Sequence, residues 1–371
     1  MSYDLYVGMQ YAPFCARVGL DDMAPRKPLA TANAVYALAA SARYIALGVS
    51  NNPYLQVFKD GELIDVTTPI LPSRTQSCCM VFSPDGRRLY CGLYNTPFLA
   101  VINTETWSLL SGLPAIPIAP SQLALSHDGS KLMICHNDTR QPVLLDTQTL
   151  AAINTGNVFG QYSYGAAFNH DDSILYVSSN NPRLLRAIRV SDWTVIASVA
   201  TPGNGRVFYN GDHVLWQQAY GQDHLLLDAQ LNPLPLEITR QTQAITAVPG
   251  GFVITYADNA YPRVELMRTP DGTRETIDGM AYVFGQIYDL AVTQPVFKRI
   301  YGTVRDRDGN PAQRTVRVFR RADGRQVAEA QSDAASGDYE IAVVDDEYDV
   351  VAQAADGEKL NDLIYARVTP E

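Results

Sequence analysis

The sequence has few of the features that would place this protein in an oxidising compartment or in a membrane. Its 371 residues contain only five cysteines, an odd number, and their spacing matches no zinc motif. No run approaches the roughly 18 apolar residues of a membrane-spanning helix. The start, MSYDLYVGMQYAPF, lacks the basic and apolar regions of a secretory signal. We therefore expect reduced thiols, synthesis in a cytoplasm and no membrane insertion.

The cysteines lie in or beside predicted strands, where a reduced thiol behaves as a small buried hydrophobic group. Cys78 and Cys79 are consecutive. Consecutive side chains of a regular strand point to opposite faces of the sheet, so we expect these two thiols to be separated.

Positive charge is also scarce. The chain has 29 Lys and Arg against 39 Asp and Glu, a formal net charge of −10, and no basic stripe offsets it. This balance argues against a nucleic acid as partner.

Catalytic and metal-binding motifs are missing as well. No G-x-S-x-G occurs, and the segment GQYSYG at 160–165 has its serine one place late. His127 and His170 occupy the same predicted turn in two repeats, and His224 has no evident carboxylate partner. The loop at 306–310 has too few oxygen ligands for an EF-hand, so we expect a hairpin turn there. No catalytic residue, metal or cofactor is predicted.

What is present is a repeat. Residues 78–110, CCMVFSPDGRRLYCGLYNTPFLAVINTETWSLL, contain four apolar runs separated by three turns. Pro and Gly of the S-P-D-G segment suit a tight turn, so the pattern predicts a four-stranded antiparallel meander. Further copies stand at 34–66, 122–153, 165–197, 205–236 and 244–277, with Trp193 where Trp107 falls. A spacing of about 40 residues is typical of propeller blades.

The ends of this region supply a seventh unit. Leu5–Asp22 align with the second and third strands of a repeat, and QIYDLAV at 286–292 looks like a first strand. Joining them closes the ring without a free sheet edge. The sequence therefore predicts an all-β protein with a seven-bladed β-propeller over residues 1–297. The turns and spacing resemble those of the WD40 and YVTN propellers, although the Gly-His and Trp-Asp marks of WD40 blades are absent.

Residues 298–371 differ in character. Strict alternation in TVRVFRR and YEIAVV, with turns near 308–311, 323–324 and 336–338, predicts a β-sandwich of about seven strands. The order of its parts, GTVRDRDGNPA, a hairpin, SGDYEI and YDVVAQA, resembles a carboxypeptidase-regulatory or transthyretin-like, Ig-like module.

The ending DVVAQAADGEKLNDLIYARVTPE resembles the ends of sandwich modules in structural proteins of tailed bacteriophages. The resemblance implies a virion protein of the tail or baseplate, made in the host cytoplasm. Its partners would be other tail or baseplate proteins, or a glycan or protein receptor on the host surface.

The turns between second and third strands are expected on the face that carries the links between blades, around the channel mouth. They are rich in Asn, Tyr, Phe and Arg, which stack on apolar faces and bind polar edges. The same residue types also form turns well, so the pattern fits a structural role equally. The predicted binding residues are Tyr11, Asn52, Tyr54, Asn95, Phe98, Asn137, Arg140, Asn181, Arg183, Tyr220, Asp223, Asn259, Tyr261 and Arg263.

Three functions follow. The favoured one is a non-enzymatic virion protein that binds through the propeller. The alternatives are a propeller enzyme, lactonase-like or sugar-acting, at the channel mouth, and a cytoplasmic bacterial scaffold.

Overall fold

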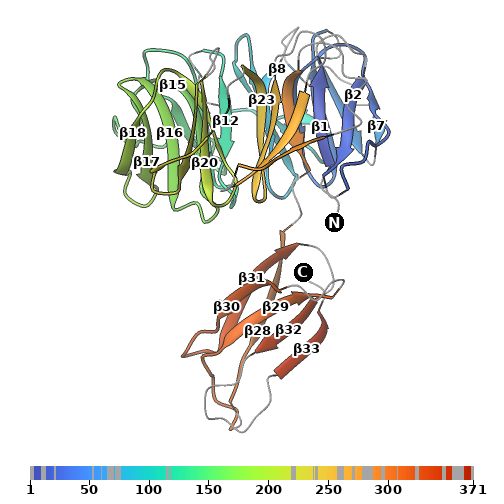
Figure 1. Ribbon diagram of the computed structural model, residues 1–371, viewed down its shortest axis with the longest axis vertical. Helices are drawn as coiled ribbons and strands as arrows, with labels where there is room; N and C mark the ends of the chain where they lie inside the picture. The colour runs from blue at the N-terminus through green and yellow to red at the C-terminus, as the bar shows by residue number, and fades with distance from the viewer. Residues whose placement is uncertain are drawn as a thin grey trace. The chain divides into compact units, whose positions relative to one another are not determined.

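The computed structural model is all-β (Figure 1). The residues that it describes are 4–9, 14–20, 22–51, 54–59, 61–64, 71, 77–113, 116, 118–218, 223–236, 238, 241–256, 263–269, 272–277, 287–293, 297–306, 308–321, 326–344, 348–352 and 363–368. Among them, no helix is long and apolar enough to cross a membrane. The chain divides into two compact units, Ser2–Gln294 and Pro295–Glu371, so the division lies three residues before the expected position.

Seven antiparallel sheets make up the first unit, and we number them as blades along the chain. Blade 1 joins the two ends of the unit. It contains β27 (Ile287–Val292), β1 (Asp4–Met9), β2 (Phe14–Gly19) and β3 (Leu29–Ala30). Blade 2 contains β4 (Val35–Ala40), β5 (Tyr44–Val49), β6 (Leu55–Lys59) and β7 (Glu62–Ile64). Blade 3 contains β8 (Ser77–Phe82), β9 (Arg88–Leu93), β10 (Leu99–Asn103) and β11 (Ser108–Leu109).

The later blades repeat the plan, except that blade 4 has three named strands. Blade 4 contains β12 (Gln122–Leu125), β13 (Lys131–Cys135) and β14 (Val143–Asp146). Blade 5 contains β15 (Gln161–Phe168), β16 (Ile174–Asn181), β17 (Arg183–Arg189) and β18 (Thr194–Ala200). Blade 6 contains β19 (Gly205–Tyr209), β20 (His213–Gln218), β21 (His224–Asp228) and β22 (Pro233–Leu234). Blade 7 contains β23 (Thr242–Val248), β24 (Gly251–Tyr256), β25 (Arg263–Arg268) and β26 (Arg274–Thr276).

The blades form a closed ring. Their first strands contact one another in the order β27, β4, β8, β12, β15, β19, β23 and back to β27. β27 pairs antiparallel with β1, with Leu5 opposite Val292 and Met9 opposite Ile287. The two ends of the unit therefore share one sheet, which confirms the seven-bladed propeller and leaves no unpaired edge at the closure.

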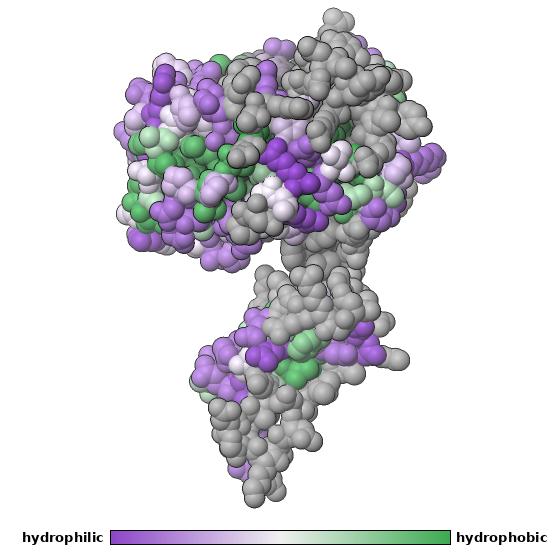
Figure 2. Space-filling model, in the orientation of Figure 1, coloured by the Kyte–Doolittle hydropathy of each residue, from purple (hydrophilic) through white to green (hydrophobic). Residues whose placement is uncertain are grey.

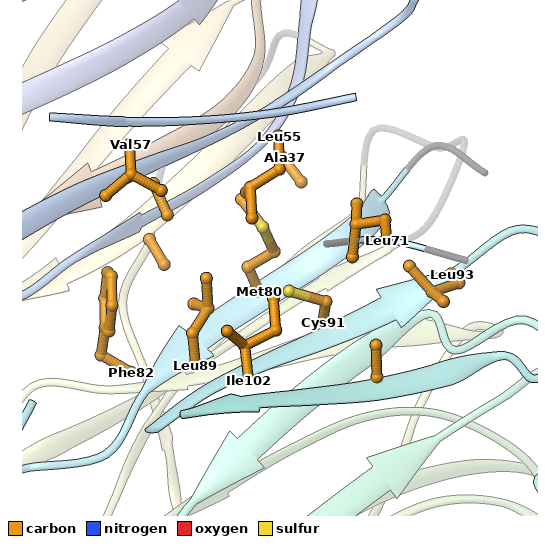
Figure 3. Packing of buried hydrophobic residues seen from close by; sticks show 13 residues of the cluster. Ala37, Leu55, Val57, Leu71, Met80, Phe82, Leu89, Cys91, Leu93 and Ile102 are labelled. Atoms are coloured by element: carbon orange, nitrogen blue, oxygen red, sulfur yellow. The ribbon is translucent and has the colours of Figure 1, made fainter. Parts of the chain in front are cut away.

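Each neighbouring pair of blades has its own hydrophobic core. Leu89, Cys91 and Leu93 of β9 pack toward blade 2, and Tyr90 of the same strand packs toward blade 4. Figure 3 shows Met80, Leu89 and Cys91 of blade 3 against Val57 of blade 2. Because both faces of a blade are covered, the second strands are almost continuously apolar, as in LYCGL.

Small residues let the blades approach closely. Gly48 lies in β5, and a Cβ atom there would be 2.9 Å from Cβ of Ser77 in blade 3. Real Cβ contacts of that length are essentially absent from proteins. Glycine at this place in the second strand is therefore a packing requirement between blades 2 and 3.

Trp107 and Trp193 occupy strained turn positions and are half-buried. Trp107 has φ 51° and Trp193 has φ 56°, which is the left-handed region. Trp107 meets Tyr44 of blade 2 edge-on, with 5.1 Å between ring centroids, and Trp193 meets Phe159 at 6.3 Å. Gly61 and Gly272 take the equivalent turn positions in blades 2 and 7, also with positive φ. The indole rings of Trp107 and Trp193 therefore cover the cores between blades at the outer edge of the propeller.

Polar residues gather where the strands end. Figure 2 shows hydrophobic residues over the strands on the left of the propeller unit, with hydrophilic residues above and below them. Val195 and Ile196 of the outermost strand β18 are exposed, at 45% and 44%. On this side of the propeller, the hydrophilic residues therefore lie toward the two ends of the strands.

The second unit is a sandwich of two sheets. One sheet pairs β28 (Phe297–Thr303) with β31 (Asp338–Val344). The other has the order β30 (Gln326–Gln331), β29 (Thr315–Arg320), β32 (Tyr348–Ala352) and β33 (Leu363–Val368). Six strands are described, where alternation predicted about seven. Val316, Val318 and Ile341 belong to its core. Asp306 caps the backbone N–H groups of Asp308 and Asn310 at 3.0 and 2.8 Å, so the loop at 306–310 is a turn.

Candidate functional site

One face of the propeller carries both the links between blades and the turns between second and third strands. Neighbouring strands of a blade run antiparallel, so the turn after the second strand lies at the same end as the link to the next blade. We call this the link face and define it by the turns 51–54, 95–98, 136–141 and 180–183 and the links 31–34 and 201–204.

The structure describes only part of the predicted binding set on this face. Outside the described residues lie Tyr11, Asn52, Tyr220, Asn259 and Tyr261. Arg263 is the first residue of β25, and the surroundings of its side chain lie outside the described part of the structure.

The two aromatic residues of the described set pack on blade cores. Tyr54 and Phe98 have φ values of 62° and 63° and close their turns through backbone hydrogen bonds. Both are half-buried: Tyr54 packs on the core between blades 2 and 3, and Phe98 on the core between blades 3 and 4. Their geometry gives each ring a structural role.

Carboxamide side chains are the exposed groups of the link face. Nδ2 of Asn181 donates to Oε1 of Gln161 at 2.9 Å, and Nδ2 of Asn204 donates to Oδ1 of Asn137 at 3.2 Å. Asn95 is also exposed. These hydrogen bonds fix the orientation of the amides. Asn137 and Asn181 are exposed, whereas Oδ1 of Asn204 is buried without a hydrogen-bond partner among the described residues.

The two arginines of the set are held by neighbours in their own turns. Arg140 is paired with Asp138 through hydrogen bonds of 2.8 and 3.0 Å, and this guanidinium holds the pKa of Asp138 well below its usual range. Nε of Arg183 donates to Oδ1 of Asn180 at 3.2 Å. The backbone N–H of Asp223, which is exposed, donates to Oε1 of Gln218 at 3.3 Å. The described set is thus spread around the ring and does not converge on one point.

Sequence reasoning missed a second group, which comes from the first strands of three blades. Arg206 lies in β19 of blade 6, Asp289 in β27 of blade 1 and Cys79 in β8 of blade 3. The neighbouring thiol of Cys78 and burial raise the pKa of Cys79 well above its usual value, and the charge of Arg206 partly opposes this rise. All three residues lie near the starts of first strands, and the first strands contact one another around the inside of the ring. We call them the axial group.

The members of the axial group differ in their hydrogen-bond and ion-pair partners. Oδ2 of Asp289 accepts the backbone N–H of Leu38 in blade 2 at 2.8 Å, and Oδ1 accepts the N–H of Leu290 at 3.0 Å. Burial raises the pKa of Asp289 to about 6, with Arg206 partly opposing the rise. Across the described parts of the chain, the Arg206 side chain makes no hydrogen bond or ion pair. All three residues are half-buried.

The expected separation of Cys78 and Cys79 is wrong. The two sulfur atoms lie 3.9 Å apart, and Sγ of Cys78 donates to the carbonyl oxygen of Pro120 at 3.1 Å. A β-bulge interrupts the register between Ser77 and Cys79, and it turns Cys78 out of the regular alternation. Similar bulges occur in β4, β15, β23 and opposite β1 in β27. The repeat in the sequence identifies these segments only as first strands, so it does not predict the axial group.

The histidines are dispersed. His127 is in the turn of blade 4, where Nδ1 lies 3.0 Å from Oδ1 of Asp172, and His224 contacts Oγ1 of Thr242 at 2.8 Å. Burial lowers the pKa of His136. In the described residues, no group of three or more His, Cys, Asp or Glu side chains is placed to hold a metal ion.

The opposite face carries a groove between blades 3 and 4, with a volume of about 620 Å³. Its walls are the first turns of the two blades, at 83–88 and 128–130. Asp85 and Asp128 there accept hydrogen bonds from their own turns, and Arg87 and Glu105 form an exposed ion pair of 3.4 Å. These charged side chains of the groove therefore already have hydrogen-bond or ion-pair partners within it.

No protein-family model matches this chain, and no curated protein matches its sequence. Solved structures do match its fold. A chain of the mitotic checkpoint complex matches with a TM-score of 0.56 and 12% identity, over 70% of this chain and 81% of that one. A chain of hydrazine synthase from Kuenenia stuttgartiensis matches with a TM-score of 0.44 and 15% identity, over 53% of this chain; this chain spans 64% of its length. The first similarity supports the propeller fold alone.

Proposed function

We propose that this chain is a non-enzymatic interaction protein of a bacteriophage particle, located in the tail or baseplate, and that its link face binds the partner. The observation that carries the proposal is the set of exposed carboxamide and guanidinium groups on that face. They are oriented by hydrogen bonds such as Asn181 with Gln161, on turns of a closed ring. Rigid, pre-oriented polar groups lose little entropy when they bind.

The location in a virion rests on the phage-like ending of the sandwich unit, and the partner class follows from the chemistry of the link face. Amide and guanidinium groups bind the hydroxyl and amide edges of glycans and proteins. Docking to other tail or baseplate proteins and recognition of a host-surface receptor use the same chemistry.

Two experiments test this function. Mass spectrometry of purified particles should detect the polypeptide at a fixed ratio to the other tail proteins, and its absence from particles would end the proposal. Binding of the purified protein to host cells or to isolated tails should then fall when Asn95, Asn181 and Arg183 are changed together to Ala. The matched control carries Arg87→Ala and Glu105→Ala on the opposite face, and equal loss from both variants would count against the link face.

A second candidate is an enzyme at the channel mouth, and the axial group is what favours it. A carboxyl group with a pKa of about 6 is suited to proton transfer near neutral pH. Turnover of lactone or glycoside substrates that is lost in Asp289→Asn would support this function over simple binding.

A further inference from the structure

We propose that Cys78 and Cys79 form a reversible redox site on the first strand of blade 3, where the two thiols close into a disulfide by exchange with a small disulfide such as oxidised glutathione. The site is independent of the partner that the link face binds, because it consists of the two sulfur atoms and their immediate neighbours. It would hold two thiols in a reducing compartment and one disulfide in an oxidising medium.

The contact between the two sulfur atoms is the observation that carries this inference. Sγ of Cys78 and Sγ of Cys79 lie 3.9 Å apart. Consecutive side chains of a regular strand point to opposite faces of the sheet, so the contact requires a distortion of β8. The bulge supplies it, because Ser77 pairs with Leu93 and Cys79 with Gly92, which leaves Cys78 as the extra residue of the ladder. The fold therefore brings together two thiols that a regular strand would separate.

Neighbouring residues hold both sulfur atoms in place. A Cβ atom at Gly92 in β9 would lie 2.6 Å from Sγ of Cys79, a distance that real Cβ atoms essentially never show. Glycine at this position therefore leaves the space that the Cys79 sulfur occupies. Sγ of Cys78 donates to the carbonyl oxygen of Pro120 at 3.1 Å, in the link that leads to blade 4. The pair is thus positioned by blade 3 on one side and by this link on the other.

The other three cysteines are shielded from solvent. Cys15, Cys91 and Cys135 are fully buried. Both members of the adjacent pair are partly exposed. Burial also raises the pKa of Cys15 and Cys135 to about 12, so these thiols supply little of the thiolate that attacks a disulfide near neutral pH. A small disulfide in solution should therefore react with the adjacent pair and leave the core thiols unchanged.

The exchange takes two steps. In the first, the Cys78 thiol loses its proton and its sulfur attacks one sulfur of the small disulfide; a mixed disulfide forms, and the other half leaves as a thiolate that takes up the proton. In the second, the Cys79 sulfur attacks the Cys78 sulfur, and the remaining half leaves as a second thiol with the Cys79 proton. Two protein thiols are oxidised while one small disulfide is reduced to two thiols. Cys78 reacts first, because its own thiol and burial raise the pKa of Cys79 well above the usual value.

Closing the bond changes the contact with the link to blade 4. An S–S bond is about 2 Å long, so the two sulfur atoms must approach each other from 3.9 Å. The disulfide has no S–H group left to donate to the carbonyl oxygen of Pro120. Cα atoms of consecutive residues are about 3.8 Å apart, less than the roughly 4.4 Å or more that disulfides usually span. A strained and partly exposed disulfide is easily reduced, so the modification should be reversible.

Peptide mass spectrometry of the folded, full-length protein tests the site. After reaction with oxidised glutathione, the remaining thiols are alkylated under unfolding conditions. We expect a disulfide between Cys78 and Cys79 within one peptide, alkylation of the three buried cysteines and no retained glutathione. Excess reduced glutathione should restore alkylation of all five cysteines. An unreacted pair, an adduct that never closes, a bond to a buried cysteine, or a bond that persists in excess reduced glutathione would each overturn the proposal.

Variants separate the two steps. Cys79→Ser should retain a glutathione adduct on Cys78, because the second step then lacks its attacking sulfur. The matched control, Cys78→Ser with Cys79→Ser, keeps the three buried cysteines and should not react. Thermal melting of both variants identifies lost folding, which would expose the core thiols, and the peptide map of the unchanged protein does not depend on either variant. Reaction of the folded control to the same extent as the unchanged protein would overturn the assignment.

Discussion

The backbone N–H of Asp4 donates a hydrogen bond of 3.0 Å to Oγ1 of Thr293, and the N–H of Thr293 donates to the carbonyl oxygen of Asp4 at 3.1 Å. The two residues are 289 positions apart in the chain. Their contact ends the β1–β27 ladder that closes the ring, so the stability of the whole propeller depends on a pairing between its two ends.

Deleting residues 2–20 should therefore unfold the propeller. The deletion removes β1 and β2 and with them Leu5, Val7 and Met9, which are fully buried in the core between blades 1 and 7. We expect loss of the cooperative thermal transition followed by circular dichroism, or aggregation through the exposed sheet edges. A monomeric product that melts cooperatively near the original temperature would contradict the closure.

Trp107 offers a test of backbone strain. Trp107→Ala should cost about 1–3 kcal/mol of unfolding free energy, less than a fully buried tryptophan, because the ring is half-buried against Tyr44. Trp107→Gly should cost about 1 kcal/mol less than Trp107→Ala, because Gly adopts φ 51° without strain. Chemical denaturation measures both values. The usual order, with Ala more stable than Gly, would show that the turn is not strained.

Asp289 should make stability depend on pH. In the unfolded chain its pKa is about 3.9, and in the folded protein burial raises it to about 6. Between these values the unfolded chain releases the proton while the folded protein keeps it, so unfolding free energy falls as pH rises from about 4 to 6. Asp289→Asn removes this contribution and keeps an oxygen for the Leu38 N–H. The variant should gain stability relative to the natural protein between pH 4 and 7.5; parallel curves would refute the shift.

Phe98 and Asn95 stand in the same turn and should behave differently. Phe98→Ala should cost about 1–3 kcal/mol, because the ring packs on the core between blades 3 and 4. Asn95 is exposed, and its turn hydrogen bond uses the backbone carbonyl, so Asn95→Ala should change stability by less than about 0.5 kcal/mol. Thermal melting and partner binding, measured on both variants, should separate a structural residue from a binding one.

The predicted binding residues show what a sequence repeat can and cannot predict. Contact with a partner is predicted for Tyr54 and Phe98 because aromatic side chains in these turns can stack on apolar faces, and the structure packs both on blade cores. Asn95 and Asn181, from the same turns, are exposed. Recurrence alone does not separate the two roles, because a repeat copies the residues that close a turn together with those that point away from it.

The number of blades, their strand order and the shared closing sheet were determined by the sequence itself. Alternation of apolar residues, turn residues and repeat spacing are local properties that recur in each blade. The axial group was decided only by the tertiary structure. Arg206, Asp289 and Cys79 are far apart in the chain, and no sequence motif links them. Their place on the inner strands of one ring depends on its closure, and the contact between Cys78 and Cys79 depends on a β-bulge that leaves no periodic trace in the sequence.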